Sequence, residues 1–219
     1  MAIARVMFVQ AASQALPIVA AFAVRGRHQP VPYPRLVFWC GVLVVTDVLA
    51  LVVAKAFGNN LWMVYVTLPV EVGLVLWLLS EWQPNELLRL TYLTAIPVMV
   101  TVVASLLVLT DPGRTFYRWV SPFLALLALA AALHTLVNRT LLSRGPLAQQ
   151  DWFWICLGMA LFWLGYVSVP VFADTFLATH EDWVWWAYVS RAYTDIAAFI
   201  LMSWGIWCQR VPARSLGSS

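Results

Sequence analysis

The chain has 219 residues, of which 63% are hydrophobic and only 11% charged, and its mean hydropathy is +0.82. Soluble domains carry about a quarter charged residues, so this composition excludes an ordinary soluble domain and indicates an integral membrane protein. The net charge of +3 is spread over short connecting segments, and the basic run typical of a nucleic-acid-binding protein is absent.

Seven apolar stretches follow one another along the chain, each about twenty residues long, the length needed to cross a hydrocarbon core of about 30 Å. They are 4–24, 36–57, 61–80, 88–110, 119–138, 151–173 and 183–208. The short connectors carry proline, glycine, asparagine or charged residues, so consecutive helices are predicted to run antiparallel and to pack as neighbours. The sequence therefore predicts an all-α bundle of seven transmembrane helices as a single domain over residues 1–210, with a short cytoplasmic tail at 211–219.

The orientation of the bundle follows from its basic residues. With the N-terminus outside, the inner connectors hold eight arginines and the outer side holds four basic residues. Basic residues are enriched on the cytoplasmic side of membrane proteins. The N-terminus is therefore predicted outside and the C-terminus inside, in the plasma (inner) membrane of a bacterium. Tryptophans near the helix ends, Trp39 and Trp62 among them, are predicted to lie at the membrane interfaces.

Three carboxylates lie near the middle of these apolar stretches: Asp47 in the second, Glu71 in the third and Asp195 in the seventh. Each is about eleven to thirteen residues into its helix, which at 1.5 Å per residue places all three near the midplane. Arg191 is the only basic residue at comparable depth, and its spacing of four residues from Asp195 allows the two side chains to pair. Intramembrane acids usually face a polar interior and mark a site or pathway. If the three converge, their mutual repulsion favours the binding of a proton by at least one of them.

Other polar side chains share these depths. Tyr65 and Tyr188 lie on the helices of the acids, toward the outer side, and are predicted to line a polar cavity with them. Gln10 and Gln14 place two amides on one face of the first helix, a face predicted to turn toward the bundle because lipid cannot satisfy amides. The alternative is that each acid is bound by a neighbouring hydroxyl or amide and serves only helix packing.

Several chemistries lack the residues that they need. The only lysine, Lys55, ends the second helix, which excludes a retinal Schiff base in the last helix, and His134 is the only histidine within a span, which excludes bis-histidine haem ligation. No H-E-x-x-H or G-x-S-x-G motif is present, and Cys40, Cys156 and Cys208 lack metal-ligand spacing. We therefore expect neither metal nor cofactor. Acid–base catalysis by paired carboxylates is the one enzymatic route left, and no specific motif supports it.

The stretch Asn59-Asn60-Leu61-Trp62, followed by Tyr65, Pro69 and Glu71, resembles a pattern in small stand-alone seven-helix membrane proteins of bacteria whose function is unassigned. The resemblance covers the second and third helices. It implies the seven-helix fold and carries no activity, ligand or site residue with it.

These observations predict a receptor or sensor-like membrane protein that binds a small ligand in a polar cavity between the second, third and seventh helices. Asp47, Glu71 and Asp195 would form the polar floor, and Arg191 would orient an acid or an anionic group of the ligand. No kinase or cyclase domain is attached, so a membrane protein partner would carry the signal. Two alternatives stay open: a small proton-coupled transporter that uses the same acids, and a structural subunit of a larger membrane complex.

Overall fold

The computed structural model describes residues 2–24, 32–58, 61–109, 119–176 and 181–208. Within these residues every regular element is helical, which confirms the all-α prediction. The helices are α1 (Ala2–Ser13), α2 (Leu16–Ala23), α3 (Pro32–Phe57), α4 (Val64–Ser80), α5 (Glu86–Leu109), α7 (Ser121–Leu142), α8 (Asp151–Phe176) and α9 (Glu181–Cys208), with short 3-10 helices at Leu61–Met63 and Leu147–Gln149. The predicted tail, 211–219, and the asparagines of the stretch at 59–62 lie outside the described residues.

Four helices are long and apolar enough to cross a membrane: α3, α5, α7 and the segment Asp151–Ser168 of α8. Two further apolar segments are shorter: Phe8–Ala23, which covers the end of α1 and all of α2, and Val64–Ser80, which is α4. The described part of α9 does not join the four, because Arg191 and Asp195 lower its hydropathy. In length and composition these helices are those of a membrane protein.

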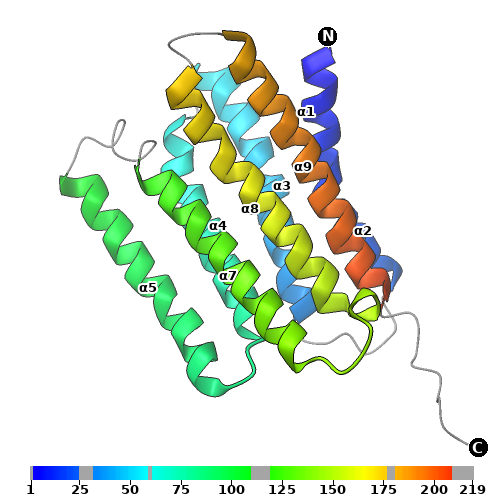
Figure 1. The fold of residues 1–219 in the computed structure, drawn as a ribbon. Helices are drawn as coiled ribbons and strands as arrows, with labels where there is room; N and C mark the ends of the chain where they lie inside the picture. The colour runs from blue at the N-terminus through cyan, green and yellow to red at the C-terminus, as the bar shows by residue number, and fades with distance from the viewer. Residues whose placement is uncertain (1, 25–31, 59–60, 110–118, 177–180, 209–219) are drawn as a thin grey trace, which may run out of the picture.

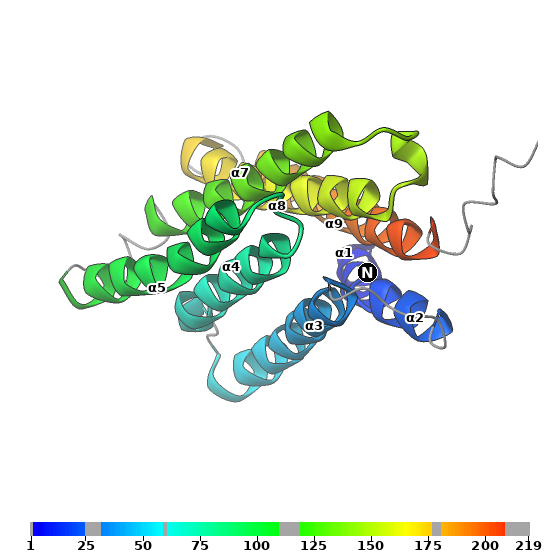
Figure 2. The same cartoon turned by 90° about the horizontal axis from the view of Figure 1, so that it is seen from below.

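The helices lie side by side as a bundle (Figure 1). The pair α8 and α9 forms the longest contact, and α7 packs on the other side of α8. On the opposite side of the bundle α4 contacts α3, α5 and α7. Seen along the bundle axis, α5 occupies one edge, and α1 and α2 lie between α3 and α9 (Figure 2). Segments from the two ends of the chain are therefore neighbours.

The prediction of one continuous helix over 4–24 is wrong, because the chain turns at Gln14 and Ala15. Pro17, at the start of α2, has no amide hydrogen, and its ring would clash with the carbonyl of Ser13 in a continuous helix. The Ser13 hydroxyl instead donates to the carbonyl of Gln10 at 2.6 Å and so helps to end α1. The break places the side chain of Gln14 inside the bundle, where it is 4% exposed.

Helix α3, which corresponds to the second predicted span, begins at Pro32, four residues before the predicted start at residue 36. Proline is favoured in the first turn, where its missing amide hydrogen leaves no bond unmade. Arg35, predicted in a connector, is therefore helical. Its guanidinium donates to the carbonyl of Trp77 at 2.7 Å, lies 2.7 Å from the Glu81 carboxylate and stacks 4.2 Å over the Trp77 ring. These contacts hold the start of α3 against the end of α4.

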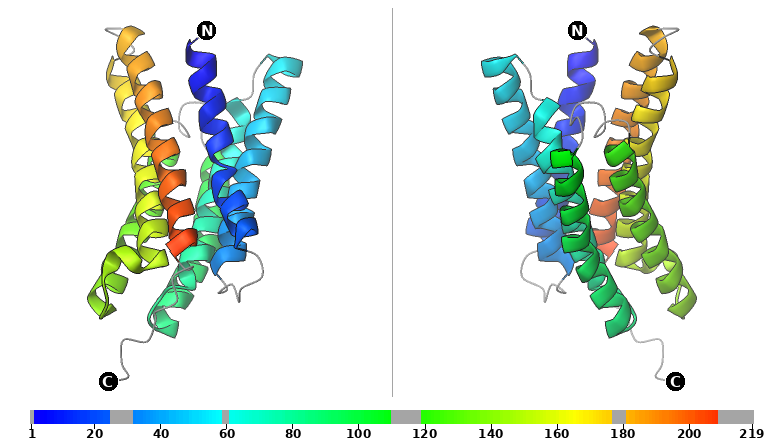
Figure 3. Two further views of the ribbon diagram at one scale, coloured as in Figure 1. Left: turned by 90° about the vertical axis from the view of Figure 1, so that its right-hand side faces the viewer. Right: turned by 90° about the vertical axis from the view of Figure 1, so that its left-hand side faces the viewer.

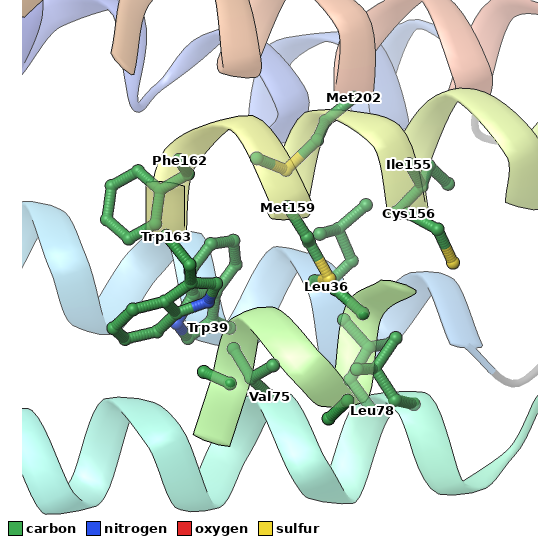
Figure 4. Close-up of a cluster of buried hydrophobic side chains, with 14 of the residues drawn as sticks. Leu36, Trp39, Val75, Leu78, Ile155, Cys156, Met159, Phe162, Trp163 and Met202 are labelled. Atoms are coloured by element: carbon green, nitrogen blue, oxygen red, sulfur yellow. The ribbon is translucent and has the colours of Figure 1, made fainter. Parts of the chain in front are cut away.

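The core fills the space between α3, α4, α7, α8 and α9 (Figure 4). Its buried side chains include Leu36, Trp39, Val75, Leu78, Ile155, Met159, Phe162, Trp163 and Met202. The interfacial prediction for Trp39 is wrong, since the side chain is 0% exposed and its ring lies edge-on to that of Phe162, 5.5 Å between centroids. This face of α3 turns toward α8, so the indole contributes apolar packing instead of meeting the headgroups.

Glycines bring α8 and α9 close enough for their backbones to touch. A Cβ added at Gly158 would lie 2.6 Å from the carbonyl oxygen of Ala198, and one at Gly205 would lie 2.8 Å from the carbonyl oxygen of Asp151. Small residues permit this approach between membrane helices, where van der Waals packing is a main source of association.

Candidate functional site

A group of polar side chains from α1, α3, α4 and α9, together with the turn after α1, lies about halfway along the bundle. We call it the polar centre. It consists of Gln10, Gln14, Asp47, Glu71, Arg191 and Asp195. Figure 3 shows how this is possible: α1 runs between α9 on one side and α3 on the other. Two amides from the first span therefore reach acids from helices far along the chain.

Asp195 is the most deeply buried acid of the polar centre, at 1% exposed. Its Oδ2 accepts a hydrogen bond of 2.7 Å from Nε2 of Gln10 and lies 3.7 Å from Nε of Arg191. Its Oδ1 has no hydrogen-bond partner among the described residues. Gly165 of α8 makes room on that side, because a Cβ there would overlap Thr194 Oγ1 and lie 3.7 Å from Asp195 Oδ1. The carboxylate is thus half satisfied.

Asp47 is bound by the second amide. Gln14 donates its Nε2 to Oδ2 of Asp47 at 2.7 Å, while Oε1 of Gln14 has no partner within the described part of the chain. Asp47 itself is exposed. Because an ionised carboxylate at this depth is not stable against hydrocarbon, its exposed side requires water or a polar ligand.

Glu71 is the third acid, and it is 7% exposed. No hydrogen bond or ion pair joins its carboxylate to another described residue. The charges within electrostatic range of Glu71 are those of Asp47 and Arg191. Arg191 is likewise within range of Asp47 and Asp195. The Arg191 guanidinium is therefore the positive charge that interacts with all three carboxylates. When all three are ionised, the centre has an excess of two negative charges.

Arg191 is held in place by an aromatic ring of α8. Its guanidinium carbon lies 4.2 Å from the centroid of Tyr166, a cation–π arrangement. Tyr166 is a site residue that sequence reasoning missed, because one more aromatic side chain in a helix rich in tryptophan and phenylalanine carries no distinct signal. The stacking places the guanidinium against α8.

The polar centre marks the limit of the tightly packed part of the bundle. On α3 the last buried side chain is Leu43, on α4 the first is Leu68, and on α9 the first among described side chains is Ala192. Beyond these residues, toward the end of the bundle where α1 begins, the described side chains of α3, α4 and α9 are partly or fully exposed. The other half of the bundle is closed by the core of Figure 4.

The structure brings together Asp47, Glu71, Arg191 and Asp195 but not the two predicted tyrosines. Tyr65 lines an apolar groove of about 660 Å³ between α4 and α5. Tyr188 is 53% exposed and lies two turns from Asp195 on the same face of α9. The prediction that Gln10 and Gln14 face the bundle is confirmed by their bonds to the acids. A site formed by the second, third and seventh helices alone is therefore incomplete.

A second polar cluster, between α5 and α7, is separate from the polar centre. The hydroxyl of Tyr92 donates to the carbonyl of Ala131 at 3.0 Å and lies 2.8 Å from Nδ1 of the exposed His134. Gln83 donates to Oγ1 of Thr135 at 2.9 Å in the same cluster. His134 is thus a hydrogen-bonded packing residue.

Chemically, the polar centre can accept hydrogen bonds, bind positive charge and hold protons on its carboxylates. In the described residues no group of three histidine, cysteine or acidic side chains lies close enough to hold a metal ion. Comparison of the chain with protein-family models, curated proteins and solved structures finds no match. The resemblance to seven-helix bacterial proteins therefore stays a prediction.

Proposed function

We propose that the chain is a seven-helix, multi-pass protein of the plasma (inner) membrane, with its N-terminus outside, and that its polar centre binds a small ligand as a receptor or sensor does. In this topology α1 and α2 together form the first span. One observation carries the proposal: the polar centre, with its unpaired carboxylate and amide oxygens, lies where the buried side chains of α3, α4 and α9 give way to exposed ones. A ligand that enters from the end of the bundle where α1 begins reaches the acids and is stopped there by the buried core.

The hydrogen bonds of the polar centre suggest how binding changes the protein. The two amides belong to the first span, whereas the acids that they bind belong to α3 and α9. A ligand that competes for Asp47 or Asp195 releases Gln10 or Gln14 and so shifts the position of the first span. A ligand shifts a conformational equilibrium only through different affinities for its two states, and these two bonds supply the difference. A membrane protein partner would detect the movement.

A proton-coupled transporter is the second candidate. The excess of acids over the single Arg191 favours it, because unpaired intramembrane carboxylates are the usual proton carriers. This function requires the closed half of the bundle to open in turn, so that the centre is reached from both sides.

Cysteine labelling separates these functions. Cys208 is replaced by serine, whereas Cys40 and Cys156 are buried and stay. Asp47→Cys is then treated with a charged, membrane-impermeant thiol reagent in right-side-out and in inside-out vesicles. Val45→Cys, 56% exposed on the other side of α3, and Leu43→Cys, 4% exposed one turn deeper, are matched controls.

We expect Asp47→Cys to react from the outer side alone and both controls to stay unlabelled. Reaction from both sides would favour the transporter. If Asp47→Cys reacts from neither side, the site is not accessible, and the subunit of a larger complex becomes the better proposal. If the aspartate variant does not fold, the measurement is repeated with Leu51→Cys. Leu51 is 63% exposed and lies one turn after Asp47 in α3, nearer the end of the bundle where α1 begins.

A further inference from the structure

We propose that the ligand of the polar centre is an organic ammonium compound, a cation that carries N–H donors. This inference rests on the proposed binding function and names the chemical class of its ligand. It reverses the sequence-based expectation that Arg191 orients an anionic group.

The first argument is charge. Three carboxylates lie within range of one guanidinium, and that guanidinium already pairs with Asp195 at 3.7 Å and stacks on Tyr166. An anionic ligand would add a fourth negative charge to a buried site, with no free cation to receive it among the described residues of the centre. A cationic ligand reduces the excess of negative charge. Charges taken out of water are stable only when they are paired and hydrogen-bonded.

The second argument is the balance of donors and acceptors. The atoms without partners at the centre include Oδ1 of Asp195 and Oε1 of Gln14, on side chains 1% and 4% exposed, and the carboxylate of Glu71 lacks a hydrogen bond among the described residues. These atoms are acceptors. One buried donor of the centre, Nε of Arg191, also lacks a hydrogen bond, but it lies 3.7 Å from Oδ2 of Asp195 and so already faces a carboxylate. Leaving a buried acceptor without a hydrogen bond costs about 1–3 kcal/mol. A ligand with N–H groups can donate hydrogen bonds to these oxygens and so remove that cost.

The third argument is size. The described side chains offer no set of three ligands close enough for one metal ion. The acids are nevertheless close enough for electrostatic repulsion of Glu71 and Asp195 by Asp47. A bare ion at one carboxylate would leave the others unpaired. An organic cation with several donors spread over a few ångströms can reach Glu71 from one end and Asp47 or Asp195 from the other.

The test uses the purified full chain in lipid nanodiscs at constant ionic strength, with thermal unfolding followed by tryptophan fluorescence. The probes are 1,4-diammoniobutane, the bis(trimethylammonium) compound of the same chain length, which keeps the charges but has no N–H group, and acetate. We expect a saturable rise in the unfolding temperature with the diammonium probe and none with the other two. Titration calorimetry measures the affinity directly.

Two variants locate the binding. Glu71→Gln keeps the size of the side chain and removes its charge, and should weaken diammonium binding roughly tenfold or more, the effect of losing one charge-assisted hydrogen bond. Glu86→Gln removes a carboxylate that is 67% exposed in its side chain and lies outside the polar centre, and should leave the affinity unchanged. Asp195→Asn replaces Glu71→Gln if the latter does not fold.

Other results overturn the proposal. Equal binding of the trimethylated probe shows that donors do not matter, and acetate binding that is lost in Arg191→Gln shows that the ligand is an anion. No response to the diammonium probe refutes the ammonium class as well. In each of these cases one-sided labelling of Asp47→Cys would still support the proposed binding function, so the two failures are distinguishable.

Discussion

Replacing Gly158 by alanine tests the close approach of α8 and α9 that positions Arg191 and Asp195. The added Cβ would lie 2.6 Å from the carbonyl oxygen of Ala198 and 2.7 Å from Cγ of Met202. The methionine side chain can swing aside, but the carbonyl belongs to the backbone of α9, so the helix itself must move. Overpacking of this kind costs about 1–3 kcal/mol. A gain of up to about 1 kcal/mol in helix propensity offsets part of it, and we expect a net loss of about 1–2 kcal/mol.

The matched control is Gly41→Ala on α3. No heavy atom lies within 4 Å of a Cβ added there, so the same substitution should be neutral or stabilise the protein by about 0.5–1 kcal/mol. The free energy of unfolding is measured in mixed micelles by titration with sodium dodecyl sulfate, with tryptophan fluorescence as the signal. A Gly158→Ala variant as stable as Gly41→Ala would refute the backbone contact between α8 and α9.

Three further substitutions can be measured in the same unfolding assay. Tyr92→Phe removes a buried hydroxyl that contacts a carbonyl and two side chains, and should destabilise the protein by about 1–2 kcal/mol. His134→Ala, at an exposed position, should cost less, and the opposite order would contradict the assignment of the Tyr92 hydroxyl as the central contact of this cluster. Gln10→Leu removes the amide that donates to Asp195 at 2.7 Å and should cost about 1–3 kcal/mol at neutral pH, a result refuted by unchanged stability. Arg35→Lys keeps the charge but loses the planar stacking and the forked donors, so a loss of about 0.5–2 kcal/mol is expected, and a neutral effect would show that a point charge is sufficient there.

Local properties of the sequence were sufficient for the elements of the fold. Hydropathy and length depend on consecutive residues, and they place α5 within two residues of its observed bounds, Glu86–Leu109. The pairing of Arg191 with Asp195 follows from helical periodicity alone, because residues four apart share a face. The break after Ser13 also had a local signal in Pro17, which could have been given more weight.

The composition of the polar centre depended on tertiary structure. Gln10 and Asp195 are 185 residues apart in the chain, and no local pattern states that the first and last spans are neighbours. The burial of Trp39 and the contact of Arg191 with Tyr166 have the same origin, since both depend on which face of α3 or α9 turns toward α8.

The sequence by itself therefore determined that the chain is helical and apolar enough for a membrane, and which of its side chains are costly at that depth. These properties follow from the free energy of transferring individual residues and from backbone geometry. Only the tertiary structure decided which amides donate hydrogen bonds to the acids, which oxygens of the polar centre are left without a hydrogen bond, and which half of the bundle is filled by the buried core. Those outcomes depend on side-chain packing between helices distant in the chain, which an amino-acid pattern along one helix does not encode.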